Sequence, residues 1–161
     1  YWKDVGTVSS LWEANMDLIG ENPAFDIADR KWNIYSRNKA YAPHYIGENA
    51  KIKNSNITEG CSVDGTVLNS IISRNVEIGK DSVIKESVIM EGAVIGEGVK
   101  IEKAIIGEGV KIADFSEIGL TESENNPYES AMCTDGIVMI EGEVEFLEKT
   151  IIPKNSMVCC E

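Results

Sequence analysis

Aliphatic residues recur along this chain at a fixed interval, and this repeat limits the possible folds more than any other feature. Between residues 46 and 119 they fall into three columns. From Val67 onward the steps between columns are five, six and six residues, so each cycle spans 17 residues, whereas the first cycle spans 15. The first column holds Ile52, Val67, Ile84, Ile101 and Ile118; the second holds Ile57, Ile72, Ile89 and Ile106; the third holds Ile46, Val63, Ile78, Ile95 and Ile112. Such self-similarity is typical of stacked repeats.

Three steps of about six residues per cycle predict a triangular coil with a short strand on each side. The aliphatic residues would point inward, where only the coils above and below can cover them. Besides the three aliphatic columns, a column of small residues repeats in the same phase and fits the corners: Ser55, Ser70, Ser87 and Ala104. We therefore predict an all-β fold, a parallel β-helix of hexapeptide repeats, and its left hand is a property of known hexapeptide proteins. A β-sandwich does not keep a 17-residue phase, and a helical solenoid disfavours β-branched columns rich in glycine.

Length and charge exclude several classes of protein. The chain has 161 residues and a net charge of −12, which suits one domain, or one domain with a fragment of another. Because no basic run offsets the acidic surface, we expect no nucleic-acid or anionic-membrane partner. No apolar run reaches the roughly 20 residues of a membrane span, and the first residues show no signal-peptide pattern. The four cysteines have no metal-site or disulfide spacing, which suits a reducing cytoplasm.

The first 22 residues lie outside the repeat and are expected to form a helix. Ser9 or Ser10 is a candidate N-cap, with Glu13 at the capping-box offset from Ser10. Gly20 is a natural end for this helix. Helical spacing is carried by Leu11, Trp12, Ala14, Met16 and Leu18.

Residues 23–45 are expected to be a linker and end cap, followed by the β-helix domain at 46–161. We predict a brief strand at Trp32, Ile34 and Tyr35, and an aromatic cover for the open end of the first coil. That cover would consist of Trp32, Tyr35, Tyr41 and Tyr45. Residues 120–135 are polar and predicted to form a mobile loop, and the aliphatic pattern resumes at Gly136 to close the other end.

The repeat itself carries no catalytic constellation. Acyl transfer on such a scaffold needs a histidine as general base, and a metal site needs several histidines. The single histidine, His44, precedes the coils and is expected at the surface or end cap. Asp4 lies between an aromatic residue and Gly6 in Trp2-Lys3-Asp4-Val5-Gly6. It is a candidate ligand for a divalent metal, although from the spacing alone a solvated turn aspartate is the more ordinary role.

Several segments resemble bacterial glucose-1-phosphate adenylyltransferase, also called ADP-glucose pyrophosphorylase. The opening Tyr1-Trp2-Lys3-Asp4-Val5-Gly6-Thr7 is shared with other sugar-nucleotide pyrophosphorylases, and the helix and linker that follow narrow the resemblance to this family. The remaining segments, in order, are 11–18, 29–35, 43–46, 59–61, 86–90 and 136–140. The resemblance covers essentially the whole chain.

The resemblance implies an enzyme that makes ADP-glucose and pyrophosphate from ATP and glucose 1-phosphate for glycogen synthesis. In this family a Rossmann-like α/β domain carries a Gly-rich nucleotide loop and two aspartates that hold Mg²⁺. Asp4 matches the second of those aspartates. Residues 1–22 would then be the end of the catalytic domain, and the loop, the first aspartate and the sugar-phosphate lysine are absent from this sequence. We therefore expect Mg²⁺ only in the intact enzyme, and neither a cofactor nor activity in this chain alone.

The family also implies partners for the β-helix. It would contact its own N-terminal catalytic domain, support a homo- or hetero-tetramer, and help form an allosteric site. Members activated by sugar phosphates use basic side chains where this sequence has Glu108, Glu141 and Glu143, which argues against such activation. The basic residues best placed at a domain junction are Arg30, Lys31 and Arg37, which are equally plausible as solvated linker charges.

Three other functions stay open. The chain could belong to a non-catalytic, regulatory-type subunit of the same enzyme. It could be a hexapeptide-repeat acyltransferase, which the lack of a histidine on the coils disfavours. It could also come from a pyrophosphorylase specific for another nucleotide sugar.

Overall fold

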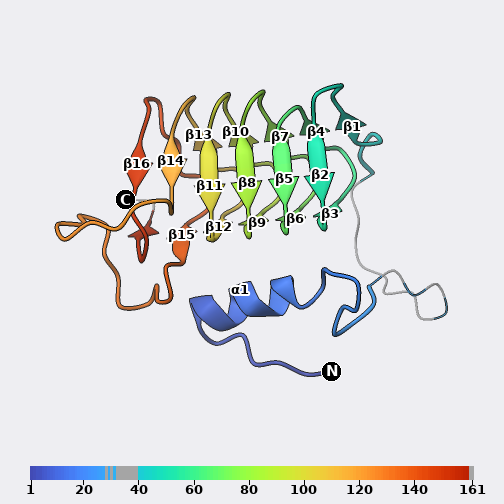
Figure 1. Ribbon diagram of the computed structural model, residues 1–161, viewed down its shortest axis with the longest axis horizontal. Helices are drawn as coiled ribbons and strands as arrows, with labels where there is room; N and C mark the ends of the chain where they lie inside the picture. The colour runs from blue at the N-terminus through green and yellow to red at the C-terminus, as the bar shows by residue number, and fades with distance from the viewer. Residues whose placement is uncertain (28, 30, 32–39, 160–161) are drawn as a thin grey trace.

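The computed structural model describes residues 1–27, 29, 31 and 40–159, and these form a left-handed parallel β-helix with one α-helix along its side (Figure 1). The predicted fold class is confirmed. Sheet A contains β1 (Tyr45–Ile46), β4 (Ser62–Val63), β7 (Glu77–Ile78), β10 (Val94–Ile95) and β13 (Lys111–Ile112). Sheet B contains β2 (Lys51–Lys53), β5 (Thr66–Leu68), β8 (Val83–Lys85), β11 (Lys100–Glu102), β14 (Glu117–Ile118) and β16 (Ile151–Ile152). Sheet C contains β3 (Asn56–Ile57), β6 (Ile71–Ile72), β9 (Val88–Ile89), β12 (Ala104–Ile106), β15 (Val138–Ile140) and β17 (Met157–Val158).

The three aliphatic columns of the sequence are the inward side chains of the three sheets. Parallel pairing keeps each column in register, so that Val67 lies beside Ile84 and Ile84 beside Ile101. The columns meet in one interior cluster whose middle coils are at most 3% exposed. Each inward residue is covered by equivalents in the coils above and below, which explains why the period had to be kept through the chain.

Buried serines satisfy the backbone at the corner between sheets B and C. The hydroxyl of Ser70 donates to the carbonyl of Leu68 at 2.7 Å and accepts from the backbone N–H of Ser87 at 3.1 Å. Ser87 repeats both contacts with Lys85 and Ala104. Because a buried backbone N–H without a partner is costly, the hydroxyl column explains the serines that the sequence placed near a corner.

A corner between sheets A and B shows why glycine is needed at one position. Gly98 has a φ of +64°, and a Cβ built on it would lie 2.6 Å from a ring carbon of Phe115 in the next coil. Any larger residue would therefore combine a left-handed backbone with a clash. Asp81 and Phe115 adopt the same backbone region at the equivalent corner positions of the neighbouring coils.

The helix α1 spans Val8–Met16 and begins two to three residues earlier than the sequence predicted. Thr7, not Ser9 or Ser10, is the N-cap, because its backbone is extended and its hydroxyl accepts from the N–H of Ser10 at 3.1 Å. The hydroxyl of Ser10 accepts in turn from the N–H of Thr7, so serine takes the capping-box role that we assigned to Glu13. The helix ends at Met16 with Asp17 as C-cap, before the predicted stop at Gly20. At nine residues it is far too short to cross a membrane, and it is the only helix among the described residues.

One outer face of the β-helix is apolar, and α1 covers it (Figure 1). On sheet C the residues that alternate with the inward column include Ile71, Val88 and Ile105. Val88 is only 4% exposed and Ile105 is fully buried, although neither belongs to the interior cluster. The equivalent outward residues of sheets A and B, such as Glu77 and Lys100, are exposed. The middle of sheet C is therefore buried on both sides, as in an α/β layer.

The first coil is less covered than the sequence predicted. Ile46 and Ile52 point inward but remain 39% exposed. Tyr45 does not cap this end, because it lies on the outward side of β1 and is 60% exposed. Tyr41 runs along the side instead, where its hydroxyl donates to Oε1 of Glu91 at 2.5 Å. The predicted strand at Trp32, Ile34 and Tyr35 lies outside the described residues.

The polar segment 120–135 has no helix or strand, but hydrogen bonds connect it to the last coil. Asn126 Nδ2 donates to the carbonyl of Lys154 at 3.1 Å, and the N–H of Met157 donates to the carbonyl of Tyr128 at 2.8 Å. Tyr128 also packs against the interior cluster. The aliphatic pattern resumes in β15, β16 and β17, which extend sheets B and C beyond this insertion. Residues 120–135 are thus a long excursion from a corner that returns to the same stack.

We expect Ile89→Asp to unfold the β-helix. Ile89 is fully buried on the inward side of β9, and an unpaired buried carboxylate costs several kcal/mol. Urea unfolding followed by circular dichroism measures the loss. Val83→Asp is the matched control, because Val83 lies on the outward side of β8 and is 36% exposed. A native unfolding midpoint for Ile89→Asp would contradict the inward assignment.

Candidate functional site at the N-terminal segment

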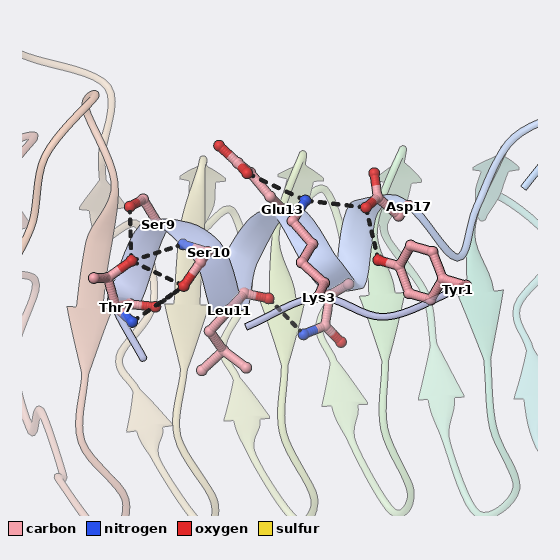
Figure 2. Close-up of polar contacts among 9 residues, drawn as sticks. Tyr1, Lys3, Thr7, Ser9, Ser10, Leu11, Glu13 and Asp17 are labelled. Atoms are coloured by element: carbon pink, nitrogen blue, oxygen red, sulfur yellow. Dashed lines mark hydrogen bonds and ion pairs between the residues drawn. The ribbon is translucent and has the colours of Figure 1, made fainter. Parts of the chain in front are cut away.

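Residues 1–7 fold back along α1 and are held there mainly by the carboxylate of Asp17, with a second contact from Glu13 (Figure 2). The hydroxyl of Tyr1 donates to Oδ2 of Asp17 at 2.8 Å, and Nζ of Lys3 donates to the same oxygen at 3.0 Å. Lys3 also forms an ion pair with Glu13, at 3.2 Å. The segment is thereby fixed to the C-terminal half of the helix, while Thr7 begins the helix at the other end.

The charges in this cluster reinforce one another. The pKa of Asp17 is lowered, first by the hydrogen bond from Tyr1 and then by the one from Lys3. The same contacts raise the pKa of Lys3 and of Tyr1, because each donates to the Asp17 carboxylate. All three side chains are reached by solvent, so the cluster orients the segment more than it stabilises the fold.

Asp4, the predicted metal ligand, lies on this segment and is exposed to solvent. Its Oδ1 accepts the backbone N–H of Gly6 at 3.1 Å, which makes a local turn. A carboxylate is a suitable oxygen ligand for Mg²⁺, which commonly takes one or two carboxylates together with water and phosphate. The described residues contain no group of three or more metal-binding side chains. Asp4 therefore fits Mg²⁺ as one ligand of a site, and the site needs further donors.

Two contacts attach α1 to the corner between sheets B and C. Nε1 of Trp12 donates to the backbone carbonyl of Glu86 at 2.7 Å. Nζ of Lys103 lies 5.2 Å from the centre of the Trp12 ring, within the range of a cation–π contact. Lys103 also donates to the carbonyl of Asp135. One tryptophan thus connects the helix, the coils and the end of segment 120–135.

An apolar groove of about 400 Å³ separates the start of α1 from the chain around residues 131–139. Val5, Val8 and Leu11 lie on one wall, and Met132 and Met139 lie on the other. This groove adjoins the segment that carries Asp4, so the N-terminal segment, α1 and the last coils form one surface.

The other predicted site residues are not gathered here. Lys31 is exposed, and its backbone N–H donates to Oδ1 of Asp29 at 2.8 Å. Arg30 and Arg37 lie outside the described residues. His44 is exposed and precedes β1, as expected for a surface residue.

The acidic residues that argued against sugar-phosphate activation lie at the corner between sheets C and A. Glu108 and Glu91 line a hollow of about 310 Å³ there together with Arg74. Arg74 is engaged by Glu59, at 3.3 Å. The N–H of Glu143 donates to the carbonyl of Glu108 at 2.7 Å, which brings a further carboxylate to the same corner. Because Arg74 is already paired with Glu59 and the other charged residues of the hollow are acidic, this corner disfavours the binding of phosphate.

Sequence reasoning missed the contacts of Trp12 and Lys103 with each other and those of Asp17 with Tyr1 and Lys3. Each of these residues lies on a different part of the repeat pattern or outside it, and no spacing rule joins them. The sequence does contain one signal for the apolar outer face of sheet C. In the column that forms this sheet, the inward aliphatic residue is preceded by a second aliphatic residue in three successive coils. Those doublets are Ile71-Ile72, Val88-Ile89 and Ile105-Ile106.

Comparison with known proteins gives the family. The model of a family described as GlmU-like, C-terminal hexapeptide matches residues 41–140. This chain belongs to that hexapeptide family. Over 158 residues, 98% of the chain, it is 46% identical to the glucose-1-phosphate adenylyltransferase of Thermosipho africanus and 42% identical to that of Desulforamulus reducens. It covers 38% and 37% of those two relatives.

A third relative shows a more similar but shorter match. The glucose-1-phosphate adenylyltransferase of Clostridium beijerinckii is 56% identical over 88 residues, which are 55% of this chain and 23% of the relative. The resemblance to the adenylyltransferases is thereby confirmed. This chain spans less than two fifths of the length of these curated relatives.

Trp12→Phe is expected to loosen α1 from the coils. Phenylalanine fills most of the same space but cannot donate to the Glu86 carbonyl, and such a hydrogen bond contributes about 1 kcal/mol. Amide hydrogen exchange of α1 should become faster while exchange of the β-helix interior stays unchanged. Trp2→Phe serves as the control, since Trp2 is 85% exposed. Unchanged exchange in α1 would show that the Trp12 contact does not hold the helix.

Acid is expected to release residues 1–7 from α1. Because the pKa of Asp17 is lowered in the folded chain, its contribution is complete above the ordinary aspartate pKa of about 3.9 and is lost as the pH falls below it. The pKa values of Tyr1 and Lys3 are raised, so their contribution to holding the segment is complete below about pH 10 and is lost only as the pH rises further. Amide exchange of residues 1–7 measures the acid transition. Asp17→Asn should remove it, and an identical transition in that variant would assign it to another group.

Proposed function

We propose that this chain is the C-terminal β-helix part of a glucose-1-phosphate adenylyltransferase, which makes ADP-glucose and pyrophosphate from ATP and glucose 1-phosphate for glycogen synthesis. The observation that carries this proposal is the 46% identity over 98% of the chain. That match includes the N-terminal segment and α1 as well as the coils. A β-helix shared only through its repeat would not explain the identity outside the repeat.

In the whole protein, the β-helix would act as a platform for assembly and regulation. Its partners would be its own N-terminal catalytic domain and further subunits in a homo- or hetero-tetramer. The packing of α1 on sheet C supports a tight junction between the catalytic domain and the β-helix, because Val88 and Ile105 lose nearly all contact with water at this face. The junction would sit beside the groove between α1 and residues 131–139. A cytoplasmic location fits such a metabolic enzyme.

Asp4 would supply one carboxylate to Mg²⁺ in the whole enzyme. The metal, when bound, neutralises charge on the phosphates during nucleotidyl transfer. Asp4 would present an exposed carboxylate on a segment fixed to α1. The backbone N–H of Gly6 orients one of its oxygens. The remaining donors would come from the rest of the catalytic domain, and this chain alone would be inactive.

A non-catalytic, regulatory-type subunit is the second candidate. It is favoured by the acidic corner at Glu91 and Glu108, which departs from the basic effector sites expected of sugar-phosphate-activated members. In that case the fold and assembly of the β-helix would be kept while Asp4 had no role in turnover.

ADP-glucose synthesis by the full-length protein, with ATP, glucose 1-phosphate and Mg²⁺, tests the proposal. The full-length protein should be active and this chain inactive. Asp4→Asn should lower kcat at least 100-fold, because a metal ligand is lost. Asp29→Asn is the matched control, since Asp29 is also an exposed aspartate that accepts a backbone N–H in a turn. An inactive full-length protein would favour the regulatory subunit, and an active isolated chain would contradict the assignment of the catalytic site to the missing residues.

A further inference from the structure

Tyr1 and Lys3, which immediately precede Asp4 in the chain, both donate to Asp17. The chemistry described above gives these two contacts no role. We propose that Asp17 is a positioning residue for Asp4, acting through Tyr1 and Lys3. This inference rests on the proposed function, because it assumes that Asp4 holds Mg²⁺ in the whole enzyme.

The contacts decide which side of the segment faces solvent. Tyr1 and Lys3 both turn toward α1 and donate to the same oxygen of Asp17, as Figure 2 shows. Trp2, between them, is 85% exposed, and Asp4 is exposed as well. Tyr1 and Lys3 therefore contact the end of the helix, whereas Trp2 and Asp4 are left exposed to solvent. If Asp17 released Tyr1 and Lys3, the 3.2 Å ion pair of Lys3 with the exposed Glu13 carboxylate would remain, and an exposed pair of this kind holds a segment only weakly.

The segment is also fixed beyond Asp4. Oδ1 of Asp4 accepts the N–H of Gly6, and Thr7 is locked to Ser10 by two hydrogen bonds of 3.1 Å. Asp4 thus lies between two attachments to the same helix, one at Asp17 and one at Thr7. The capping box holds one end, so the position of Asp4 depends at the other end on the contacts of Tyr1 and Lys3 with Asp17, together with the exposed ion pair of Lys3 with Glu13.

The helix that provides both attachments is itself held on the coils. Trp12 lies between Thr7 and Asp17 and donates to the carbonyl of Glu86 at 2.7 Å. Asn56 Nδ2 approaches the carbonyl of Leu18, at 3.4 Å, just beyond the Asp17 end. The β-helix therefore sets where α1 lies, and α1 sets where Asp4 lies.

The size of the expected effect follows from the sensitivity of phosphoryl chemistry to position. A misplacement of about 1 Å can lower a rate by about 10²-fold. In the full-length protein, Asp17→Ala should lower kcat 10- to 100-fold and raise the Mg²⁺ concentration needed for half-maximal rate several-fold. Asp17→Glu, which keeps the carboxylate, should recover part of both losses. Glu21→Ala is the control, because it removes an exposed carboxylate four residues further on.

A second measurement does not depend on activity. In this chain, amide exchange of residues 1–7 should be faster in Asp17→Ala than in Glu21→Ala, with exchange of the β-helix strands unchanged. Lys3→Met provides an independent variant if Asp17→Ala folds poorly, because it keeps the apolar stem and removes the charge. It should produce the same shift in Mg²⁺ requirement.

The outcomes separate this inference from the proposed function. If Asp4→Asn abolishes synthesis while Asp17→Ala and Lys3→Met leave kcat and the Mg²⁺ requirement unchanged, the positioning role is wrong and the proposed function stands. If Asp4→Asn is as active as the unchanged enzyme, the metal role of Asp4 and the positioning role of Asp17 are both overturned, whereas a full-length protein that makes no ADP-glucose overturns the proposed function. A loss of kcat in Asp17→Ala without any change in Mg²⁺ requirement or in exchange of residues 1–7 would also overturn the positioning role.

Discussion

The structure depends on inward aliphatic side chains that only neighbouring coils can cover. Because Val67, Ile84 and Ile101 lie in register, each coil completes the burial of the next. The backbone at the corners must then turn sharply in every cycle, which explains the buried hydroxyls of Ser70 and Ser87 and the left-handed backbone at Gly98. Stability of such a stack is shared between repeats and their interfaces.

Sheet C departs from this simple stack because it is apolar on both faces. Its outer side chains, Val88 and Ile105, need a cover, and α1 provides one. The helix in turn carries the N-terminal segment through Asp17 and Thr7. A requirement of packing thus places an exposed carboxylate, Asp4, at a defined position beside the coils, and this connects the repeat to the proposed chemistry.

The sequence predicted the β-helix well because its columns recur in phase, and periodicity survives any detail of the turns. It placed the start of α1 two to three residues too late, since Thr7 and Ser10 formed a capping box without glutamate. The aromatic cover failed for Tyr45, whose alternation along β1 turns it outward. The contacts of Asp17 and Trp12 could not be predicted, because they join residues with no common period, including Trp12 and Glu86, 74 positions apart.

A crystal structure of the full-length protein with ADP-glucose, and with Mn²⁺ replacing Mg²⁺ for its anomalous signal, would show whether α1 on the β-helix holds Asp4 at the metal. We expect α1 to lie on Val88 and Ile105, Tyr1 and Lys3 to donate to Asp17, and a carboxylate oxygen of Asp4 to coordinate the metal at close to the roughly 2.0 to 2.1 Å of a Mg²⁺–oxygen bond. A metal site without Asp4, or α1 lifted away from sheet C while Asp4 still holds the metal, would contradict this expectation.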